Sequence, residues 1–541
     1  MLITEILDKN ADLYGNELAL IEINPEFEEP INNWRDLELV ASAHRSGYRR
    51  EMSWRAFWLK SNRFANLLLS DGLQKGDKVG ILLMNCIEWL PVYFGVLKAG
   101  AIVVPLNFRY SPDEIEYCLK LADVTRLVFG SDFTERINTI QDKIPFVKTM
   151  YYLGGDTPPY AENYELKTDQ AQDTQPYSEI STTDHAAIYF SSGTTGFPKA
   201  ILHSHEALYF SCKVEQNHHG QQKNDVFLCI PPLYHTGAKM HWFGSFLVGA
   251  TSVLLRGVKP KWIIETLARE RATIVWLLVP WAQDILDCID SGDIVLEDYE
   301  LTRLRLMHIG AQPVPPGLIK RWLKIFPDHE YDTNYGLSES IGPGAVHLGV
   351  DNIAKVGSIG KAGYGWETRI VDEQGMDVPR GAVGELLLKG KGVMKEYYKD
   401  TEATAATLKD NWLYTGDMAR EDSDGFIFLV DRKKDLIITG GENIYPVQIE
   451  DFLRGYEKIR DVAVIGEAHP RLGEVAIAII DTKEECTVDE IFEFCLALPR
   501  YKRPRRVVFD TIPRNPTGKI EKPVLREKYA GGSIVAKQIE G

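Results

Sequence analysis

The sequence predicts an α/β fold, in which a large N-terminal domain of βα-built sheets carries a β-rich subdomain and is followed by a small α+β C-terminal domain. Between residues 50 and 340, apolar strands alternate with helical segments, and Gly, Asp or Pro marks each junction. After Gly357, short strands are separated by Gly-rich turns. Beyond the charged run 431–435, strands and helices follow in mixed order over a length usual for one domain. We therefore place the two domains at 1–430 and 431–541.

The first domain shows the alternation most clearly. Residues 54–73 predict a helix, 78–84 an apolar strand and 103–107 the next strand. The pattern returns with a strand at 251–255 and a helix at 261–272. Repeated strand–helix–strand units are typical of parallel sheets, so we expect parallel pairing in this domain.

The composition excludes several classes of protein. The chain of 541 residues carries a net charge of −16, which opposes the phosphate contacts of nucleic-acid binding and attraction to anionic membranes. The first residues lack the basic and apolar regions of a secretory signal. No apolar run approaches the roughly 20 residues that span a bilayer. We expect a cytoplasmic protein without a nucleic-acid partner or an integral membrane segment.

Cysteines and histidines give no sign of a metal site. The seven cysteines are scattered and include no CxxC pair, which indicates reduced, structural thiols. The pairs His203/His205 and His218/His219 offer imidazoles, but no Cys or carboxylate stands at ligand spacing beside them. The sequence therefore predicts no structural zinc.

A loop rich in Ser, Thr and Gly follows an apolar strand that begins at residue 185. Its hydroxyls, backbone N–H groups and one ammonium suit the oxygens of a polyphosphate, and its glycines allow close approach. Pro198 and Ala200 break the order of a Walker A loop, which argues against a kinase or GTPase. An ordinary surface loop is the alternative. The residues expected to bind ATP here are Ser191, Ser192, Gly193, Thr194, Thr195, Gly196 and Lys199.

The string SSGTTGFPKA in this loop resembles the signature of the adenylate-forming enzymes, which include acyl-CoA synthetases, aryl-CoA ligases, luciferases and the adenylation domains of peptide synthetases. Further motifs of the family recur in the right order from about Ser53 to Leu525. The resemblance implies a mobile C-terminal domain and the use of ATP, Mg²⁺ and coenzyme A. By its motifs the chain is identified as a member of the acyl-CoA synthetase branch.

The second motif is NYGLSE at 334–339. In the family its Tyr stacks on adenine, its hydroxyl residue contacts the α-phosphate and its Glu helps to hold Mg²⁺. These roles suit an aromatic plane, a hydrogen-bond donor and a carboxylate. The resemblance assigns nucleotide contacts to Asn334, Tyr335 and Gly336, catalysis to Ser338 and Glu339, and the metal to Glu339 with Thr194.

A strand-to-loop segment upstream resembles the part of the family that lies along the adenine. It contributes Gly310, Ala311 and Gln312. The chain departs from the family at Thr333, where Gln or Asn is usual. One usual adenine contact is therefore not predicted.

The third motif, YTGD, ends at Asp417, whose carboxylate can accept hydrogen bonds from both ribose hydroxyls. Arg432 matches the family's ribose and phosphate contact, and Lys434 matches its hinge. A hinge needs only a few residues that absorb a backbone rotation. A turn Asp followed by a charged linker is the alternative.

Two later motifs belong to the predicted mobile domain. Gly440 and Gly441 resemble the loop that swings toward the active site for thioester formation, and Asn443 follows as a nucleotide contact. Lys519, in RNPTGKI, resembles the catalytic lysine, whose ammonium stabilises charge that builds up on the transferring phosphoryl group. Coenzyme A carries phosphates that an acidic protein must hold locally. The candidates in the basic run are Arg500, Lys502 and Arg503, although such a run is commonly a solvated face.

The acyl pocket is predicted around PLYHTG at 232–237, where His235 resembles the family residue that flanks the acyl site and the coenzyme A channel. A core histidine is the alternative. The absence of Asp from 234–242 argues against an amino-acid substrate. If this stretch is helical, Lys239 shares a face with His235 and could pair with a second carboxylate or another polar substituent on the acid; a surface lysine is the alternative. The residues that could line the pocket are Tyr234, Lys239, Trp242, Trp276, Trp281, Leu337 and Ile341.

These motifs predict an acyl-CoA synthetase for a fatty or aryl acid, with the acid itself undefined. Its expected partners are the acid, ATP and coenzyme A, and a homodimer stays open as its assembly. An enzyme that loads a separate carrier protein and a luciferase-like oxygenase carry the same motifs. A binding protein without activity would be expected to lose Lys519 or Glu339, and both are present.

Overall fold

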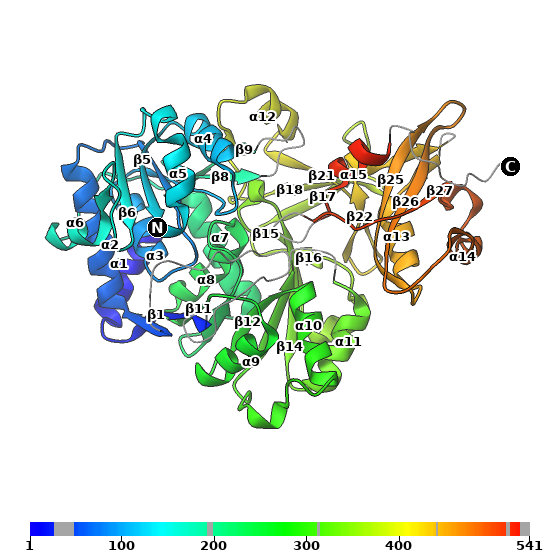
Figure 1. Ribbon diagram of the computed structural model, residues 1–541, viewed down its shortest axis with the longest axis horizontal. Coiled ribbons are helices and arrows are strands. Elements are labelled where there is room, and N and C mark those ends of the chain that lie inside the picture. Colours follow the sequence, from blue (N-terminus) through cyan, green and yellow to red (C-terminus); the bar gives the residue numbers. More distant parts are fainter. Residues whose placement is uncertain (26–47, 192–197, 311–313, 440–441, 515–519, 531–541) are drawn as a thin grey trace. The chain divides into compact units, whose positions relative to one another are not determined.

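The computed structural model of the chain (Figure 1) describes residues 1–25, 48–191, 198–310, 314–439, 442–514 and 520–530. The chain divides into two compact units. The first contains the described chain up to Thr368 together with Leu388–Leu413. The second contains Arg369–Leu387 and the chain from Tyr414 onward.

The first unit holds a nine-stranded sheet. Its six central strands are parallel, and the strands at its two ends are antiparallel to their neighbours. The strand order is β16 (Lys361–Ala362), β15 (Pro343–Leu348), β14 (Glu330–Gly336), β13 (Leu306–Gly310), β12 (Ile274–Leu278), β10 (Val226–Cys229), β11 (Thr251–Leu255), β1 (Leu18–Ile23) and β2 (Arg49–Ser53). In open parallel sheets, ligands bind beyond the carboxyl ends of the strands.

The first unit also holds an eight-stranded sheet. Its strands from β8 to β7 pair in parallel, whereas β9 pairs antiparallel with both β8 and the edge strand β19. The strand order is β19 (Glu396–Tyr397), β9 (Lys199–Ser204), β8 (His185–Ser191), β4 (Ile102–Pro105), β3 (Lys78–Leu82), β5 (Val124–Gly130), β6 (Thr149–Leu153) and β7 (Glu162–Asn163).

Helices cover these two sheets (Figure 1). Helix α7 contacts β8 and β9 of one sheet and β15 of the other, and it packs on α8, which contacts β10 and β11. These two helices therefore fill the space between the sheets. The helices of the first unit are α1 (Ile3–Leu13), α2 (Trp54–Ser70), α3 (Trp89–Lys98), α4 (Pro112–Leu121), α5 (Thr134–Ile140), α6 (Tyr164–Gln170), α7 (His205–His219), α8 (Thr236–Leu247), α9 (Pro260–Arg269), α10 (Val279–Asp290), α11 (Pro316–Ile325) and α12 (Thr401–Thr407).

The largest core lies between the sheets. It joins Val79 and Val103 of the eight-stranded sheet to Phe227 and Ile274 of the nine-stranded sheet through aromatic residues of α2, α3 and α8. Phe57, for example, is fully buried and meets the ring of Phe94 edge to face at 5.2 Å. Such aromatic pairs add to the free energy of apolar burial.

Helix α7 is defined at both ends by local chemistry. The hydroxyl of Ser204 accepts the backbone N–H of Ala207, which caps the first turn. The helix ends where Gly220 adopts φ 55°, in the left-handed region that glycine tolerates at a helix C-terminus. His218 and His219 are therefore held in the last turn, and both are buried.

The second unit contains most of a five-stranded sheet, three strands of which (β17, β18 and β21) have residues in both units. The sheet has the order β17 (Glu367–Val371), β18 (Gly384–Lys389), β21 (Trp412–Glu421) and β20 (Leu408–Lys409), with β22 (Ile427–Arg432) paired to β21. This sheet is the β-rich section that the sequence predicts after Gly357.

The C-terminal part of the second unit is built on the long β25–β26 pair. Alternate side chains face opposite sides, as the two-residue period of a strand requires. Val462 and Val464 pack with α13 and α14, whereas Ala463 and Ile465 pack with α15. The sheet has the order β24 (Glu442–Ile444), β23 (Ile437–Thr439), β26 (Gly473–Thr482) and β25 (Ile459–His469), with β27 (Arg506–Phe509) on β26 and with helices α13 (Pro446–Arg454), α14 (Val488–Phe494) and α15 (Lys522–Tyr529).

The predicted α/β class, with a large N-terminal and a smaller C-terminal part, is confirmed. The helix predicted at 54–73 is α2, and the strands predicted at 78–84 and 103–107 are β3 and β4, which pair in parallel. Among the described residues, no helix is both long and apolar enough to cross a bilayer.

All seven cysteines are free. Five are buried: Cys86, Cys118, Cys212, Cys229 and Cys495. Cys288 and Cys486 are half-buried, and burial raises the pKa of both thiols.

Candidate active site

The predicted phosphate loop connects two antiparallel strands. Ser191, the last residue of β8, pairs in register with Lys199, the first residue of β9. Five of the predicted ATP contacts, Ser192, Gly193, Thr194, Thr195 and Gly196, lie outside the described residues. A Walker A loop leads from a strand into a helix, so the hairpin supports the exclusion of a P-loop enzyme.

Beside this hairpin, two segments hold the turn that carries Glu339. The carboxylate of Glu339 accepts a hydrogen bond from the Tyr397 hydroxyl at 2.8 Å, and its carbonyl accepts the N–H of Met394 at 2.7 Å. The imidazole of His203, on β9, donates from Nε2 to the carbonyl of Ser338 at 2.8 Å. The turn Ser338–Ser340 is thus held from both sides, and it follows directly on β14.

Lys199 also contacts Tyr397. Its ammonium is 4.8 Å from the centre of the Tyr397 ring and 4.0 Å from Oδ2 of Asp400. Its side chain is 36% exposed, so the ammonium is open to a ligand. A cation and a carboxylate therefore flank one aromatic ring at the end of the predicted phosphate loop, which is the donor and acceptor pattern that a metal-bound polyphosphate needs.

The predicted adenine segments end on neighbouring parallel strands. His308 on β13 pairs with Asp332 on β14, and two residues further along are Gly310 and Asn334. Tyr335 is buried, Asn334 is half-buried and Gly336 is exposed. The carboxyl ends of β13 and β14 thus bring the two segments to one edge of the sheet, while Ala311 and Gln312 lie outside the described residues.

Ile341, after the turn that carries Glu339, has a strained backbone. Its φ is 48°, in the left-handed region that a β-branched residue rarely adopts. The side chain is fully buried, and the carbonyl accepts a hydrogen bond from the Ser211 hydroxyl. Strain of this kind clusters at functional sites, where packing over-determines the conformation. Leu337, on the other side of the turn, is half-buried.

The predicted acyl-pocket residues lie at and after the start of α8. His235 precedes the helix and is half-buried, and its ring centre lies 4.3 Å from that of Tyr234. Tyr234 is buried and meets Phe108 edge to face at 5.2 Å. Trp242 is buried in the core of the first unit.

Lys239 is fully buried, which excludes a surface lysine. Its ammonium donates to the carbonyls of Leu233 and His235 at 2.7 and 2.8 Å and lies 4.5 Å from the centre of the Tyr189 ring. Burial holds the pKa of Lys239 well below its usual range. The side chain therefore fastens the loop before α8 to the helix.

We expect Lys239→Met to lower the midpoint of thermal unfolding and to raise KM for the acid severalfold, without reordering a panel of acids. Methionine keeps the length of the side chain but leaves two carbonyls without their donor, which costs about 1–3 kcal/mol. Scanning calorimetry and initial rates with mono- and dicarboxylic acids check this. A selective loss of dicarboxylic acids would instead show that Lys239 pairs with the substrate.

The predicted ribose contacts belong to the second unit. Asp417 on β21 and Arg432 on β22 are direct register partners, and Nε of Arg432 is 3.2 Å from Oδ1 of Asp417. Gly416, at φ 71°, donates its N–H to Glu385. Asp417 is buried and Arg432 is exposed, so the pair presents a fixed carboxylate beside an accessible guanidinium. Lys434, the predicted hinge, is exposed in the turn Lys433–Asp435.

Asp431, which directly precedes Arg432, has a raised pKa. Burial raises its pKa to about 6 against the attraction of Lys522, and its carboxylate accepts the N–H of Val447. The folded state binds this proton more tightly than the unfolded state does. The stabilisation is therefore complete below about pH 4 and is lost as the pH rises through about 6.

We expect Asp431→Asn to raise the unfolding midpoint at pH 7 and to flatten its pH dependence between pH 4 and 7. The neutral amide keeps an oxygen for Val447 and avoids a buried charge, an effect of up to about 3 kcal/mol. Thermal unfolding across this pH range measures it. Asp424→Asn, at an exposed position of the same unit, is the control, and equal curves for Asp431→Asn and the native protein would contradict the assignment.

The remaining predicted residues lie in the C-terminal part. Asn443 is exposed on β24, while Gly440, Gly441 and Lys519 are outside the described residues. Arg514 and Ile520, which bracket residues 515–519, are bridged to each other. Of the basic run, Arg500 is exposed, Lys502 donates to Gln448 at 2.7 Å, and Arg503 donates to the carbonyls of Leu496 and Leu498.

Sequence reasoning missed the residues that hold Glu339 in place. His203 was considered only as a metal ligand, and burial in fact lowers its pKa to about 4, so it is a neutral hydrogen-bond donor at pH 7. Tyr397 lies in a plain EYY string without turn or motif residues. The pairing of β19 with β9 brings Tyr397 beside the hairpin. No local sequence pattern indicates this pairing.

Comparison with known proteins identifies the family. Residues 27–398 match the model of the AMP-binding enzyme family, and residues 448–519 match that of the AMP-binding enzyme C-terminal domain. The chain is 31% identical over 474 residues to long-chain-fatty-acid–CoA ligase FadD13 of Mycobacterium tuberculosis, which covers 87% of this chain and 92% of that protein. It is 31% identical over 473 residues to feruloyl-CoA synthase of an Amycolatopsis species, with 86% and 92% covered.

A solved structure shows the same fold over nearly the whole chain. The anthranilate CoA ligase AuaEII in complex with anthranoyl-AMP superposes with a TM-score of 0.84 at 25% identity, over 98% of this chain and 97% of that one. The fold and the site define an AMP-forming ligase. The chain belongs to the AMP-binding enzyme family and, within the adenylate-forming superfamily, to the acyl-CoA ligase branch.

Proposed function

We propose that the protein joins a fatty or aryl carboxylic acid to coenzyme A in two steps. The acid first attacks the α-phosphorus of ATP, which forms acyl-AMP and releases pyrophosphate. The thiol of coenzyme A then attacks the acyl carbon, which forms the thioester and releases AMP. The observation that carries the proposal is the convergence of Lys199, Tyr397 and Glu339 at the end of the phosphate loop.

Each charged residue has a role in the first step. Lys199 and the loop bind the phosphates, Ser338 contacts the α-phosphate and Lys519 stabilises the charge that develops there. Glu339 offers hard oxygen ligands, and Tyr397 fixes the orientation of its carboxylate, so the site fits Mg²⁺. The bound ion would neutralise the phosphates. Asp417 and Arg432 hold the ribose in the second unit.

The second step uses the C-terminal domain. Rotation at Lys434 would withdraw Lys519 and bring Gly440 and Gly441 to the acyl-adenylate, where glycine leaves room for the pantetheine arm. His235 gates the acid from coenzyme A. Arg500 is the best placed of the basic residues for a phosphate of coenzyme A, since it is exposed while Arg503 bonds backbone carbonyls.

The acid is proposed to be a monocarboxylic acid with an apolar tail. Three of the predicted pocket residues, Tyr234, Trp242 and Ile341, have largely apolar side chains and are buried, and both hydrogen bonds of Lys239 go to carbonyls. The relatives described above are named for a long-chain fatty acid, ferulic acid and anthranilic acid, each of which has one carboxyl group. An enzyme that consumes ATP and coenzyme A fits the expected cytoplasmic location.

The decisive experiment incubates the protein with ATP, Mg²⁺, coenzyme A and a panel of acids, and records nucleotides and thioesters by mass spectrometry. AMP and acyl-CoA in equal amounts support the proposal, whereas hydrolysis to ADP would overturn it. Replacing coenzyme A by a phosphopantetheinylated carrier protein tests the alternative of carrier loading. Light or oxygen uptake would identify a luciferase-like activity.

A further inference from the structure

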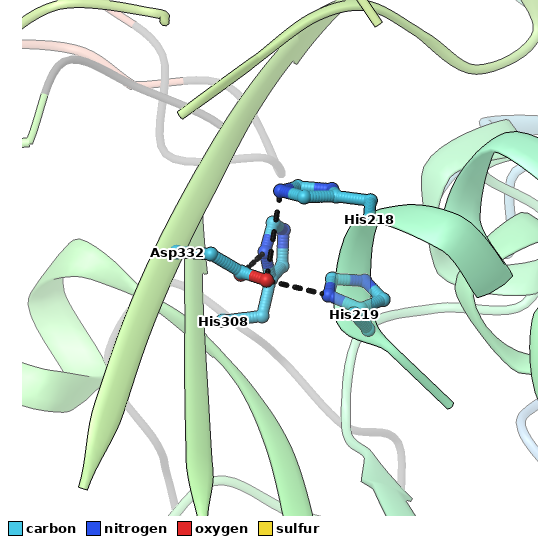
Figure 2. Close-up of side chains that lie close together, drawn as sticks. All are labelled: His218, His219, His308 and Asp332. Carbon is cyan, nitrogen blue, oxygen red and sulfur yellow. Dashed lines mark hydrogen bonds and ion pairs between the residues drawn. The ribbon is translucent and has the colours of Figure 1, made fainter. Parts of the chain in front are cut away.

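Three histidine rings surround one aspartate in the first unit, as Figure 2 shows. His218 and His219 end α7, while His308 on β13 and Asp332 on β14 are direct register partners. One nitrogen from each ring and one oxygen of the carboxylate all lie within 4.8 Å of one another. All four side chains are buried. The proposed function uses none of them.

The distances suit a small ion. Oδ1 of Asp332 lies 2.6 Å from Nδ1 of His308, and its Oδ2 lies 2.8 Å from Nδ1 of His219 and 3.5 Å from Nε2 of His218. A tetrahedral ion with bonds of about 2.0–2.1 Å separates its ligand atoms by about 3.4 Å. Movements of less than about 1 Å would therefore convert the hydrogen-bonded cluster into a coordination shell.

A second buried carboxylate lies behind two of the rings. Oε2 of Glu215 is 3.7 Å from Nδ1 of His218 and 3.4 Å from Nε2 of His219. These are the ring nitrogens opposite to those that face Asp332. Histidines that bind metals commonly give their other N–H to a carboxylate, which fixes the tautomer and the ring orientation. Glu215 would place protons on the far nitrogens and turn lone pairs toward Asp332.

We propose that His218, His219, His308 and Asp332 bind one divalent transition-metal ion, with Zn²⁺ preferred. Three imidazoles and one carboxylate form a nitrogen-rich tetrahedral set, which suits Zn²⁺ and disfavours Mg²⁺ and Ca²⁺. Glu215 acts as a positioning residue. Because four protein ligands close the shell, the site is structural and separate from the Mg²⁺ site at Glu339.

A bound divalent cation would also balance the charges of the buried carboxylates. The carboxylates of Asp332 and Glu215 and one divalent cation sum to zero when the imidazoles are neutral, and buried groups require such compensation. The alternative is a metal-free network in which an imidazolium supplies positive charge. Burial lowers the pKa of His219, but Asp332 and Glu215 outweigh it and raise the pKa to about 9. Direct measurement of bound metal distinguishes the two states.

The first test uses the full chain without a histidine tag. The protein is stripped with a chelator and titrated with Zn²⁺ against a chromophoric chelator, and metal content is measured by mass spectrometry. We expect one tightly bound Zn²⁺ per chain, a rise in the unfolding midpoint with Zn²⁺, and no displacement by excess Mg²⁺. Co²⁺ should give the intense visible absorption of a tetrahedral ion. A chain that binds no stoichiometric Zn²⁺ would overturn the proposal.

Variants then locate the ion. His308→Gln and Asp332→Asn should lower Zn²⁺ affinity at least a hundredfold, and Glu215→Gln about tenfold or more. His329→Gln, at a buried histidine that stacks on Phe326 instead, is the matched control and should bind as the native chain does. Native affinity in His308→Gln would contradict the site. If a variant does not fold, the stoichiometry and Co²⁺ spectrum of the native chain still decide.

Discussion

Replacement of Lys519 by alanine is expected to slow formation of the acyl-adenylate by about 10²–10³-fold. The reason is that the ammonium stabilises charge on the transferring phosphoryl group, which no neighbouring neutral residue can replace. Thioester formation from a supplied acyl-adenylate should change little, because the proposed rotation at Lys434 would remove Lys519 from the site in the second step. Pyrophosphate exchange measures the first step, and single-turnover acyl-CoA formation measures the second.

The matched control is Lys483→Ala, which removes an exposed lysine from the same unit. It should leave both steps at the native rate. If Lys519→Ala slowed both steps equally, the two-conformation scheme would be wrong, although the ligase activity itself would stand.

Glu339→Gln is expected to lower the rate of adenylation by about a hundredfold or more and to raise the Mg²⁺ concentration needed for half-maximal rate. The amide keeps the shape of the side chain but loses the charge that attracts the cation. Tyr397→Phe removes the hydrogen bond that orients the carboxylate and should cost about tenfold, with the same shift in Mg²⁺ dependence. Initial rates over a Mg²⁺ titration measure both effects.

The neighbouring tyrosine provides the control. The hydroxyl of Tyr398 donates to Asp123 at 2.9 Å, so Tyr398→Phe loses a comparable bond away from Glu339. We expect it to leave the Mg²⁺ dependence unchanged. A Tyr397→Phe variant that resembled Tyr398→Phe would show that Tyr397 does not orient the metal ligand.

Much of the fold could be predicted from the sequence because its signals are local. Residues 54–73 have the apolar spacing of a helix, and 251–255 form an apolar strand between turns, which are α2 and β11 in the structure. The order of the strands within each sheet, in contrast, could not be predicted from local patterns. That β10 lies between β11 and β12, or that β19 joins β9, depends on packing between distant segments, and no local pattern records it.

The residues of the candidate site also fall into two groups, those that the sequence could predict and those that it could not. Glu339, Asp417 and Arg432 stand in strings that can be recognised along the chain, whereas His203 and Tyr397 act through contacts across the fold. The histidine cluster is the clearest case. The expectation of no carboxylate near His218 and His219 overlooked Glu215 on the same helix, and the nearest carboxylate to His219, Asp332, is 113 positions away.

The free cysteines described above offer a way to observe the proposed domain rotation. Five thiols are buried, and the two half-buried ones are divided between the units, with Cys288 in the first and Cys486 in the second. A pair of maleimide dyes should therefore label the native chain once in each unit. Energy transfer between the dyes would then report the movement from adenylation to thioester formation in real time, with no cysteine introduced or removed.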